Sequence, residues 1–316
     1  MERFFDAGQL ERLQQVLDVT SLEPLHLPLR GADDIEVLIT GWGASPLTEE
    51  ILDSLPSLKA ILHSAGTVKT FLIADAWARG IRVTSAAAAN ALPVAEYTLA
   101  AILFAGKGVF DIAERYRDDP NADADGPLFA RAGNYHRTVG IIGASQIGRR
   151  VIELLGPFDI EIVLYDPYVV SGDPILEAAR LVSLEALFRS SDVVSIHAPA
   201  LPATEGLVSE AMLALLRPGA ALINTARSSL VDQDALIRAA AEGRITAVLD
   251  VTDPEPVPLD HPLRTTRGIV LTPHVAGAKG NELHRLGEAV IAEASAFVGG
   301  RTPLHPVLRS SLITGA

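Results

Sequence analysis

The stretch RTVGIIGASQIGRRVIELL, residues 137–155, decides the fold of this chain. It predicts an apolar strand, a glycine turn and a helix, the arrangement that opens a dinucleotide-binding unit. Gly143 and Gly148 occupy the outer places of the G-x-G-x-x-G pattern, and Ser145 occupies the middle one. Glycine patterns of this kind also occur in ordinary strand-turn-helix units, so the surrounding sequence has to decide what the turn binds.

A serine nucleophile is the first alternative for this turn. A nucleophile elbow has the pattern G-x-S-x-G, in which small residues flank a strained serine on both sides. Here Ile147 stands in the last place, where its side chain would crowd the turn. The sequence therefore disfavours a serine hydrolase and leaves the dinucleotide site as the better interpretation.

Asp166 supplies the context that the glycines need. A second apolar strand ends in LYDP, and Asp166 lies about 20 residues beyond the glycines, where an acidic residue accepts hydrogen bonds from the adenine ribose. A carboxylate at that place would repel a 2′-phosphate. NAD is therefore the expected cofactor rather than NADP, although a surface aspartate after an ordinary strand is the competing explanation.

Strand-like runs alternate with helical segments over nearly the whole chain, which is typical of parallel βα units. The pattern predicts an α/β fold. The expected strands are 35–40, 58–64 and 81–85 in an early set, and 138–143, 161–166, 192–197, 220–225, 246–251 and 268–273 in a later set.

Capping signals mark the expected helices between the strands. Ser45 followed by Pro46 predicts an N-cap with proline in the first turn, and Asp232 predicts another N-cap for a helix that Gly243 ends. A helical pattern over about 281–298 has no strand after it.

Because the glycine fingerprint normally opens its unit, the residues before it should form a separate one. The final helix would pack back on that first unit and make it discontinuous. We therefore expect a substrate domain of residues 1–107 plus 283–316 and a dinucleotide-binding domain of residues 108–282. The acidic segment 117–134 is expected to be a surface excursion near the junction.

Composition narrows the class of partner. The chain has 316 residues and a formal net charge of -13, with no clustered basic face, which disfavours nucleic acid as a partner. It has no cysteine, which excludes disulfides and thiolate metal sites, and we predict no metal site. Acidic residues interrupt the N-terminus, and the apolar window 97–106 is too short for a bilayer, so we expect a cytoplasmic protein that binds no membrane.

Three polar residues follow apolar strands of the later set. Arg227 comes after AALINTA, Glu255 after AVLDVTDP and His274 after GIVLTP. The carboxyl ends of parallel strands line the ligand crevice, so all three can lie near the cofactor. Each could also be an ordinary loop or core residue, but their joint occurrence beside a nucleotide motif favours catalysis.

The chemistry of hydride transfer gives these residues roles. Oxidation of a hydroxyl group needs a base for its proton, and the reverse reaction needs the matching acid. His274 paired with Glu255 suits both directions, and Arg227 can bind a substrate carboxylate through paired hydrogen bonds. A 2-hydroxy acid or a 2-keto acid would use all three.

The order of these motifs closely resembles the D-isomer-specific 2-hydroxyacid dehydrogenase family. The resemblance rests on VGIIGASQIGRR, LYDP, IHAPALPATEG, LRPGAALINTARSSLVDQDAL, LDVTDPEP and LTPHVAGA, and it is strong from about residue 90 to residue 280. It implies an α/β fold of two Rossmann-like, doubly wound parallel-sheet domains with the active site in the cleft between them. It further implies an NAD-dependent oxidoreductase and a homodimer. It also implies that Arg227 binds and polarises the substrate, that His274 is the acid and base, and that Glu255 is its partner.

The resemblance also implies the residues that bind each ligand. The substrate carboxylate would meet backbone N–H groups of Ala65, Gly66 and Thr67, together with Arg227. The cofactor would contact Gly143, Ser145, Gln146, Ile147, Gly148, Asp166, Ala198, Pro199, Thr204, Thr225, Ala226 and Asp250, the last through the carboxamide of nicotinamide.

Departures from the family pattern leave the identity of the substrate open. Serine stands at Ser145 and Ser228, where family members commonly have glycine, and the usual acidic residue after the substrate loop is absent, with Lys69 and Thr70 nearby instead. A non-enzymatic NAD-sensing regulator on the same fold is one alternative. A dehydrogenase of phosphoglycerate type is the other, and it should need a basic cluster such as Lys69 with Arg79 and Arg82.

Overall fold

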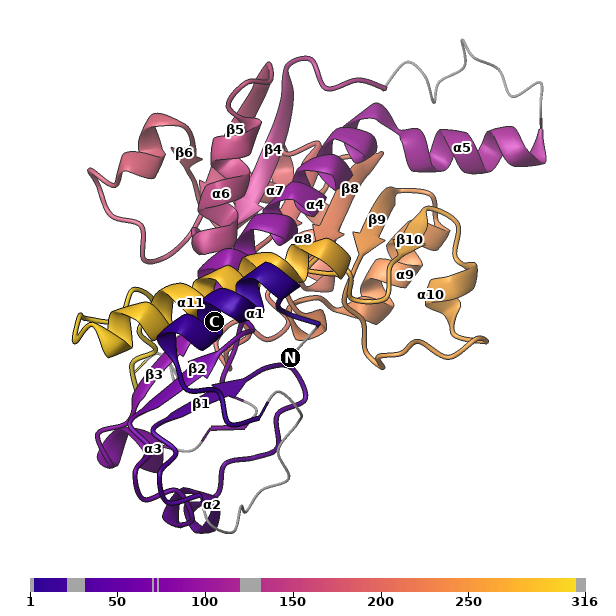
Figure 1. Ribbon diagram of the computed structural model, residues 1–316. Coiled ribbons are helices and arrows are strands. Elements are labelled where there is room, and N and C mark those ends of the chain that lie inside the picture. Colours follow the sequence, from indigo (N-terminus) through magenta and orange to yellow (C-terminus); the bar gives the residue numbers. More distant parts are fainter. Residues whose placement is uncertain (1–2, 22–31, 70, 73, 120–131, 311–316) are drawn as a thin grey trace. The chain divides into compact units, whose positions relative to one another are not determined.

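The computed structural model describes residues 3–21, 32–69, 71–72, 74–119 and 132–310 and divides the chain into two compact units (Figure 1). One unit is Met1–Ala91 with Ala278–Ala316, and the other is Leu92–Gly277. The α/β class with two parallel-sheet units is confirmed.

Both boundaries lie earlier in the chain than the predicted 107/108 and 282/283. Packing explains the shift at each end. Ala95 and Ile102 are buried in the core of the second unit, whereas Ala278 is buried with Leu283 and Leu286 in the first. Of the expected surface excursion at 117–134, residues 120–131 lie outside the described part of the chain.

The second unit is built on a seven-stranded sheet in the order β10-β9-β8-β7-β4-β5-β6, with every neighbouring pair parallel. The chain enters at β4, winds outward to β6 and then returns to wind outward through β7 to β10. This order makes the sheet doubly wound and places its topological switch between β4 and β7. Its strands are β4 (Arg137–Ile142), β5 (Ile160–Tyr165), β6 (Arg180–Leu181), β7 (Val193–Ile196), β8 (Ala220–Asn224), β9 (Ile245–Leu249) and β10 (Ile269–Leu271).

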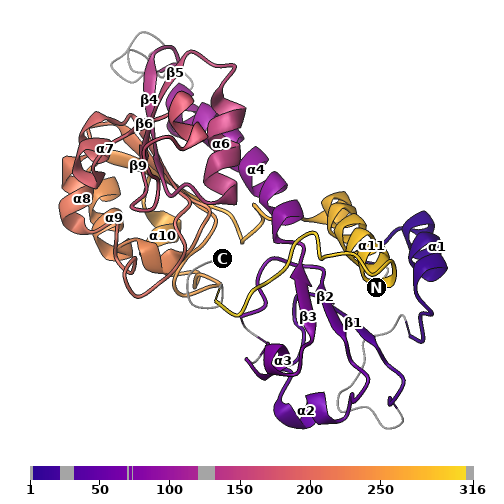
Figure 2. The same cartoon turned by 90° about the vertical axis from the view of Figure 1, so that its left-hand side faces the viewer.

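Helices cover both faces of this sheet, as the edge-on view shows (Figure 2). Leu187, Leu213 and Leu236 on one set of helices share a buried core with one face, and Ile102 and Val151 share a second core with the other. The described helices of this unit are α4 (Ala87–Lys107, which begins in the first unit), α5 (Val109–Asp118), α6 (Gln146–Leu155), α7 (Leu184–Ser190), α8 (Glu210–Leu215), α9 (Gln233–Ala241) and α10 (Pro262–Thr265), with short 3-10 turns η2 (Pro174–Glu177) and η3 (Ser228–Leu230).

Helix α4 corrects the expectation from the apolar window 97–106. Among the described helices, α4 is long enough, with 21 residues, and apolar enough to cross a membrane, judged by length and composition alone. Ala95, Ala101 and Ile102, however, are buried in the core of the second unit. This packing is what the core helix of a parallel-sheet unit requires.

The first unit has a three-stranded parallel sheet in the order β1-β2-β3. Side chains alternate between its two faces: Ile61 lies in a core with α2 and α3, and Ala60 and Leu62 lie in a core with α1 and α11. The elements are β1 (Val37–Thr40), β2 (Ala60–His63), β3 (Arg82–Ser85), α1 (Ala7–Val16), α2 (Glu49–Asp53), α3 (Asp75–Ala78), α11 (Leu283–Val298) and the 3-10 turn η4 (Gly280–Glu282).

The predicted helix starts are partly right. Asp232 does cap α9, because its Oδ1 accepts a hydrogen bond of 2.9 Å from the amide of Ala235. The N-cap expected at Ser45 is wrong: Thr48 caps α2 instead, through a bond of 3.4 Å from the amide of Ile51. The reason is that Leu47 pairs with Leu72 in an isolated parallel bridge, so the chain is still extended past Pro46.

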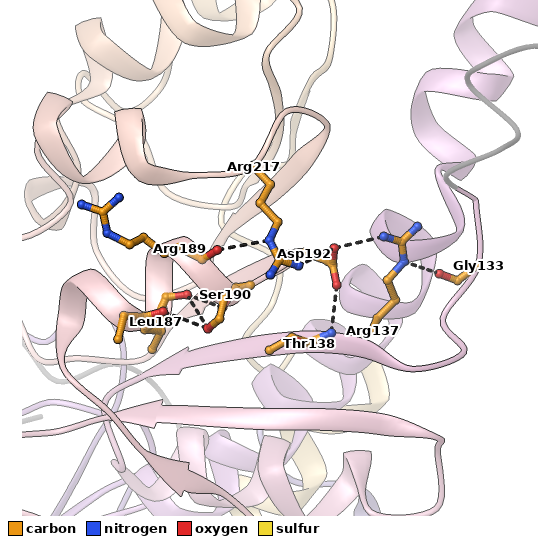
Figure 3. A network of polar contacts seen from close by, with 10 residues as sticks. Gly133, Arg137, Thr138, Leu187, Arg189, Ser190, Asp192 and Arg217 are labelled. Carbon is orange, nitrogen blue, oxygen red and sulfur yellow. Dashed lines mark hydrogen bonds and ion pairs between the residues drawn. The ribbon is translucent and has the colours of Figure 1, made fainter.

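Asp192 joins β4 to β7 at the amino end of the sheet (Figure 3). Its carboxylate accepts hydrogen bonds from the amide of Thr138 at 2.9 Å and from Nη1 of Arg137 at 3.0 Å. Its own amide donates to the carbonyl of Thr138 at 2.8 Å. Nη1 of Arg217 lies 3.7 Å from the same carboxylate. This network sets the register of the two strands that flank the switch point.

We expect Asp192→Asn to lower the free energy of unfolding by about 1–3 kcal/mol, the range for losing hydrogen bonds to a charged group. Urea denaturation followed by circular dichroism measures it. Glu161→Gln, which neutralises an exposed carboxylate on β5, is the control and should leave the midpoint unchanged. Equal midpoints for the two variants would contradict the role assigned to Asp192.

Each unit contains a buried histidine. His63 ends β2, and burial lowers its pKa to about 4. His197 follows β7, and burial lowers its pKa to about 3, while its Nε2 lies 2.9 Å from Oγ of Ser195. Both imidazoles are therefore neutral in the folded protein. As the pH is lowered, the histidines of the unfolded chain become protonated near pH 6.5, whereas those of the folded chain become protonated only at a lower pH.

Stability should consequently fall as the pH is lowered below about 6.5, by about 2 kcal/mol per buried histidine between pH 7 and pH 5. Urea midpoints at pH 7, 6 and 5 test this. His197→Asn removes one of the two groups, so its midpoint should depend less on pH than that of the wild type. The same pH dependence in both proteins would show that His197 is not the titrating group.

Candidate active site

The glycine turn after β4 is tightly packed. Gly143 has φ +97°, and a Cβ added there would lie 2.7 Å from the amide nitrogen of Ala198. A Cβ added to Gly148 would lie 2.0 Å from the carbonyl oxygen of Gly143. The first glycine therefore permits the turn and the approach of β7, and the second permits α6 to pack on it. These are the roles that the dinucleotide fingerprint assigns to glycines.

Ser145 is the N-cap of α6. Its Oγ accepts a hydrogen bond of 3.3 Å from the amide of Gly148. Gln146 is exposed in the first turn, and Ile147 packs partly against the core of the second unit. As a capping acceptor, Ser145 keeps its hydroxyl hydrogen for donation, and the N-terminus of a helix of this length favours an anion such as a pyrophosphate.

Asp166 lies directly after β5 and is held beside the same turn. Its Oδ2 accepts a bond of 2.7 Å from the amide of Ala144, and its Oδ1 accepts one of 2.7 Å from the amide of Tyr168. The carboxylate is thus oriented before any ligand arrives. Its place at the carboxyl end of β5, beside the glycine turn, fits a carboxylate that accepts the ribose hydroxyls of NAD.

An ion pair that sequence reasoning missed holds the segment after β5 against α6. Arg149 donates from Nη1 and Nη2 to the two carboxylate oxygens of Asp173, at 2.8 and 2.6 Å, and from Nε to the carbonyl of Ala144 at 3.0 Å. The hydrogen bonds from Arg149 lower the pKa of Asp173 to about 2. Nothing in the local sequence pairs these two residues, which only the fold brings together.

On the other side of the switch, β7 leads into the predicted cofactor residues Ala198, Pro199 and Thr204. Oγ1 of Thr204 donates to the carbonyl of Pro199 at 2.6 Å and accepts from the amide of Leu201 at 2.9 Å. Thr204 therefore closes the loop that places Ala198 beside Gly143. Its predicted contact with the cofactor stays a prediction.

Asn224 shapes the turn that carries Arg227, and sequence reasoning missed it. The side chain of Asn224 accepts from the amide of Ala226 at 3.0 Å and donates to the carbonyl of Arg227 at 2.8 Å. An asparagine at a strand end is the signal that could have found it, because asparagine often bonds to the backbone two residues on. The predicted cofactor residue Thr225 is buried beside it, with its Oγ1 3.1 Å from Oγ1 of Thr98.

Of the three candidate catalytic residues, the structure brings two together. Nδ1 of His274 lies 2.8 Å from Oε1 of Glu255, and both side chains are about half exposed. Arg227 is exposed, and its Nη1 donates at 2.6 Å to the carbonyl of Ala226 instead. A carboxylate can only accept, so it fixes the proton of the imidazole on Nδ1 and leaves Nε2 to face a substrate.

Asp250 is buried and bonds to the backbone that carries His274. It is 1% exposed, and its two carboxylate oxygens accept bonds of 2.8 Å each from the amides of Val275 and Ala276. The predicted contact with the nicotinamide carboxamide stays a prediction. In the structure, Asp250 fixes the backbone that follows His274 through these two hydrogen bonds.

The predicted substrate residues Ala65, Gly66 and Thr67 follow β2 in the first unit. Ala65 is buried, and its carbonyl accepts from the amide of Ala86 at 3.0 Å. Oγ1 of Thr67 accepts from the amide of Lys69 at 3.3 Å. These bonds give the loop a defined shape, and its part in substrate binding stays a prediction.

Comparison with known families matches residues 99–276 to the D-isomer specific 2-hydroxyacid dehydrogenase, NAD binding domain. That range contains the glycine turn, Asp166, the Arg227 turn and the His274–Glu255 pair. The match supports NAD as the cofactor of the second unit.

Curated relatives carry the names of enzymes. The chain is 31% identical to a glyoxylate reductase of Thermofilum pendens over 90% of its own length and 83% of that protein. It is 30% identical to a D-3-phosphoglycerate dehydrogenase of Methanocaldococcus jannaschii over 90% of its length, but it spans only 53% of that protein. These names do not favour a non-enzymatic regulator.

The solved structure of the TT0316 protein from Thermus thermophilus has a similar fold, with a TM-score of 0.78 and 31% identity over 97% of this chain and 98% of that one. The resemblance therefore extends over nearly the whole length. The chain belongs to the D-isomer specific 2-hydroxyacid dehydrogenase family, and it is an NAD-dependent oxidoreductase that interconverts a 2-hydroxy acid and a 2-keto acid.

Proposed function

We propose that this dehydrogenase works as a reductase of a small 2-keto acid, with glyoxylate as the first candidate and NADH as the reductant. The observation that carries the proposal is the contact of 2.8 Å between Nδ1 of His274 and Oε1 of Glu255. A protonated imidazole held by a carboxylate is an acid that can give a proton to a carbonyl oxygen as that oxygen gains charge.

In this mechanism His274 is the catalytic acid and Glu255 is the group that orients it. Glu255 accepts the Nδ1 hydrogen, so Nε2 carries the proton that moves to the substrate oxygen. After that transfer the neutral imidazole keeps its orientation, because the bond to Glu255 uses the other nitrogen. In the oxidation of a hydroxy acid the same Nε2 takes the hydroxyl proton back.

Arg227 is proposed to bind the carboxylate of the substrate. Its guanidinium is exposed at the end of β8 and is held by one hydrogen bond, to the carbonyl of Ala226 at 2.6 Å. A planar guanidinium can exchange that bond for two parallel bonds to a carboxylate. The turn built by Asn224 keeps the backbone of Arg227 in place while its side chain moves.

The cofactor site is proposed to use the residues around the switch point. Gly143, Ser145 and the first turn of α6 would hold the pyrophosphate, and Asp166 would accept the ribose hydroxyls. When bound, NADH supplies the hydride. Ala198 follows β7 and Thr225 follows β8, at the same edge of the sheet, and both are proposed to border the cofactor.

The charges of the first unit favour a small substrate over a phosphorylated one. In the first unit, Arg79 is engaged by the carboxylates of Asp75 at 2.5 Å and Asp53 at 2.7 Å. The basic cluster that a phosphate would need is therefore reduced to Lys69 and Arg82.

We also propose that the enzyme is a homodimer in the cytoplasm. The family resemblance supports the homodimer, and the lack of cysteine suits the reducing environment of the cytoplasm.

The purified protein with NADH should oxidise the cofactor in the presence of glyoxylate, followed as loss of absorbance at the reduced-nicotinamide band. The panel should also contain hydroxypyruvate, pyruvate, phenylglyoxylate and 3-phosphohydroxypyruvate. We expect turnover with an unphosphorylated keto acid and little with the phosphorylated one. Tight NADH binding without turnover on any keto acid would refute the proposed reductase.

His274→Ala should lower kcat by about 100- to 10,000-fold, the usual contribution of a positioned acid, because no other group in the pair can supply the proton. NADH affinity, measured by fluorescence titration, should stay close to that of the wild type. His305→Ala, at an exposed position in the first unit, is the control. Lost NADH affinity with normal turnover per bound cofactor would show that His274 binds the cofactor and is not the acid.

A further inference from the structure

A chain of hydrogen bonds runs from helix α4 to the turn that carries His274. The hydroxyl oxygen of Tyr97, on α4, lies 2.7 Å from Oγ1 of Thr272, the residue that follows β10. Oγ1 of Thr272 in turn donates to Oδ1 of Asp250, which follows β9, at 2.6 Å. Helix α4 is thus linked, through the residue after β10, to the carboxylate of the residue after β9.

The direction of the chain follows from the hydrogens available. Thr272 has a single hydroxyl hydrogen, and it is used in the bond to Asp250. Tyr97 must therefore be the donor to Thr272. Burial raises the pKa of Tyr97, which keeps the phenol protonated and suited to this role. The hydrogen bonds therefore run in one direction: Tyr97 donates to Thr272, and Thr272 donates to Asp250.

At the end of the chain, Asp250 holds an unusual backbone conformation. His274 has φ 54°, and among the described residues other than glycine only His136 shares a positive φ. A residue with a side chain is strained there by about 1–3 kcal/mol unless its surroundings hold it. The carboxylate of Asp250 accepts from the amides of Val275 and Ala276, and its carbonyl accepts from the amide of His274 at 3.0 Å.

The carboxylate would be less well fixed without Thr272. Oδ1 of Asp250 accepts from both Thr272 and Val275, so loss of the hydroxyl leaves that oxygen with one donor in a site that is 1% exposed. A buried carboxylate that loses a donor shifts toward other donors. Such a shift would move the amides that fix the His274 turn, and with them the direction of the imidazole.

We propose that Tyr97 and Thr272 are positioning residues of the reaction, which act through Asp250 to hold His274 in its left-handed conformation. The proposal rests on the proposed function of His274 as the acid. It gives α4 a part in catalysis although Tyr97 need not touch the substrate. It also explains why a helix that belongs to the core carries a hydroxyl toward the ends of β9 and β10.

The test uses Tyr97→Phe and Thr272→Val, with Thr272→Ser as the conservative variant. We measure kcat, NADH affinity and the primary isotope effect on kcat with deuterated NADH, using the best keto acid for the wild type. Displacement of a catalytic group by small distances can cost up to about 100-fold, and we expect kcat to fall about tenfold. NADH affinity should change little, and Thr272→Ser should keep most of the wild-type kcat.

The isotope effect separates positioning from mere loss of folded protein. If the chemical step slows, the isotope effect on kcat should rise, whereas a smaller folded fraction would leave it unchanged. Because Tyr97 acts through Thr272, the double variant should lose no more kcat than Thr272→Val alone. Tyr116→Phe removes an exposed hydroxyl on α5 and should behave as the wild type.

Wild-type kcat and isotope effect in Tyr97→Phe, or losses that multiply in the double variant, would overturn the proposal while the reductase function stands. If the wild type reduces no keto acid, the proposed function fails instead. A crystal structure of Thr272→Val then decides on the positioning role by itself. A His274 φ still near the wild-type value would overturn it, and a changed φ would support it.

Discussion

The second unit depends on one close approach, where β4 and β7 lie side by side and the chain turns from β4 into α6. Gly143 leaves no space for a Cβ before Ala198, and Gly148 leaves none before the carbonyl of Gly143. A larger residue at either place would push the strand, the helix and the neighbouring loop apart. The same turn starts α6 at Ser145, and the N-terminus of a helix favours an anion, so the packing constraint also fixes where this helix end lies at the switch point.

The two edges of the sheet have different tasks. At the amino edge, Asp192 binds Arg137 and the backbone of Thr138, and it joins the strands β4 and β7. At the carboxyl edge, three polar side chains accept hydrogen bonds from backbone amides of the loop beside them. They are those of Asp166, Asn224 and Asp250. Polar side chains at this edge therefore shape the loops first. The exposed candidate catalytic groups, His274 and Arg227, are carried on backbones that these neighbours hold.

The histidines of the chain also differ in their surroundings, some being buried and others exposed. His63 and His197 are neutral because burial disfavours their charge, and they pack inside the units. His274 is about half exposed beside Glu255, where a proton can be exchanged with a substrate or with water. A histidine count from the sequence would treat these residues alike. Their different surroundings, rather than their residue type, place two of them in the cores and leave His274 available for the proposed role as acid.

The sequence by itself determined the doubly wound α/β class, the cofactor turn, and the order of strands with candidate residues at their ends, because glycine spacing and apolar runs are local signals. It misplaced the start of α2, because the bridge between Leu47 and Leu72 is a long-range pairing. It could not pair Arg149 with Asp173, nor link Tyr97 through Thr272 to Asp250, since these contacts join residues that only the packed sheet and helices bring together. The tertiary structure alone decided which candidate residues meet and which backbone conformation His274 adopts, because both depend on side chains from distant strands.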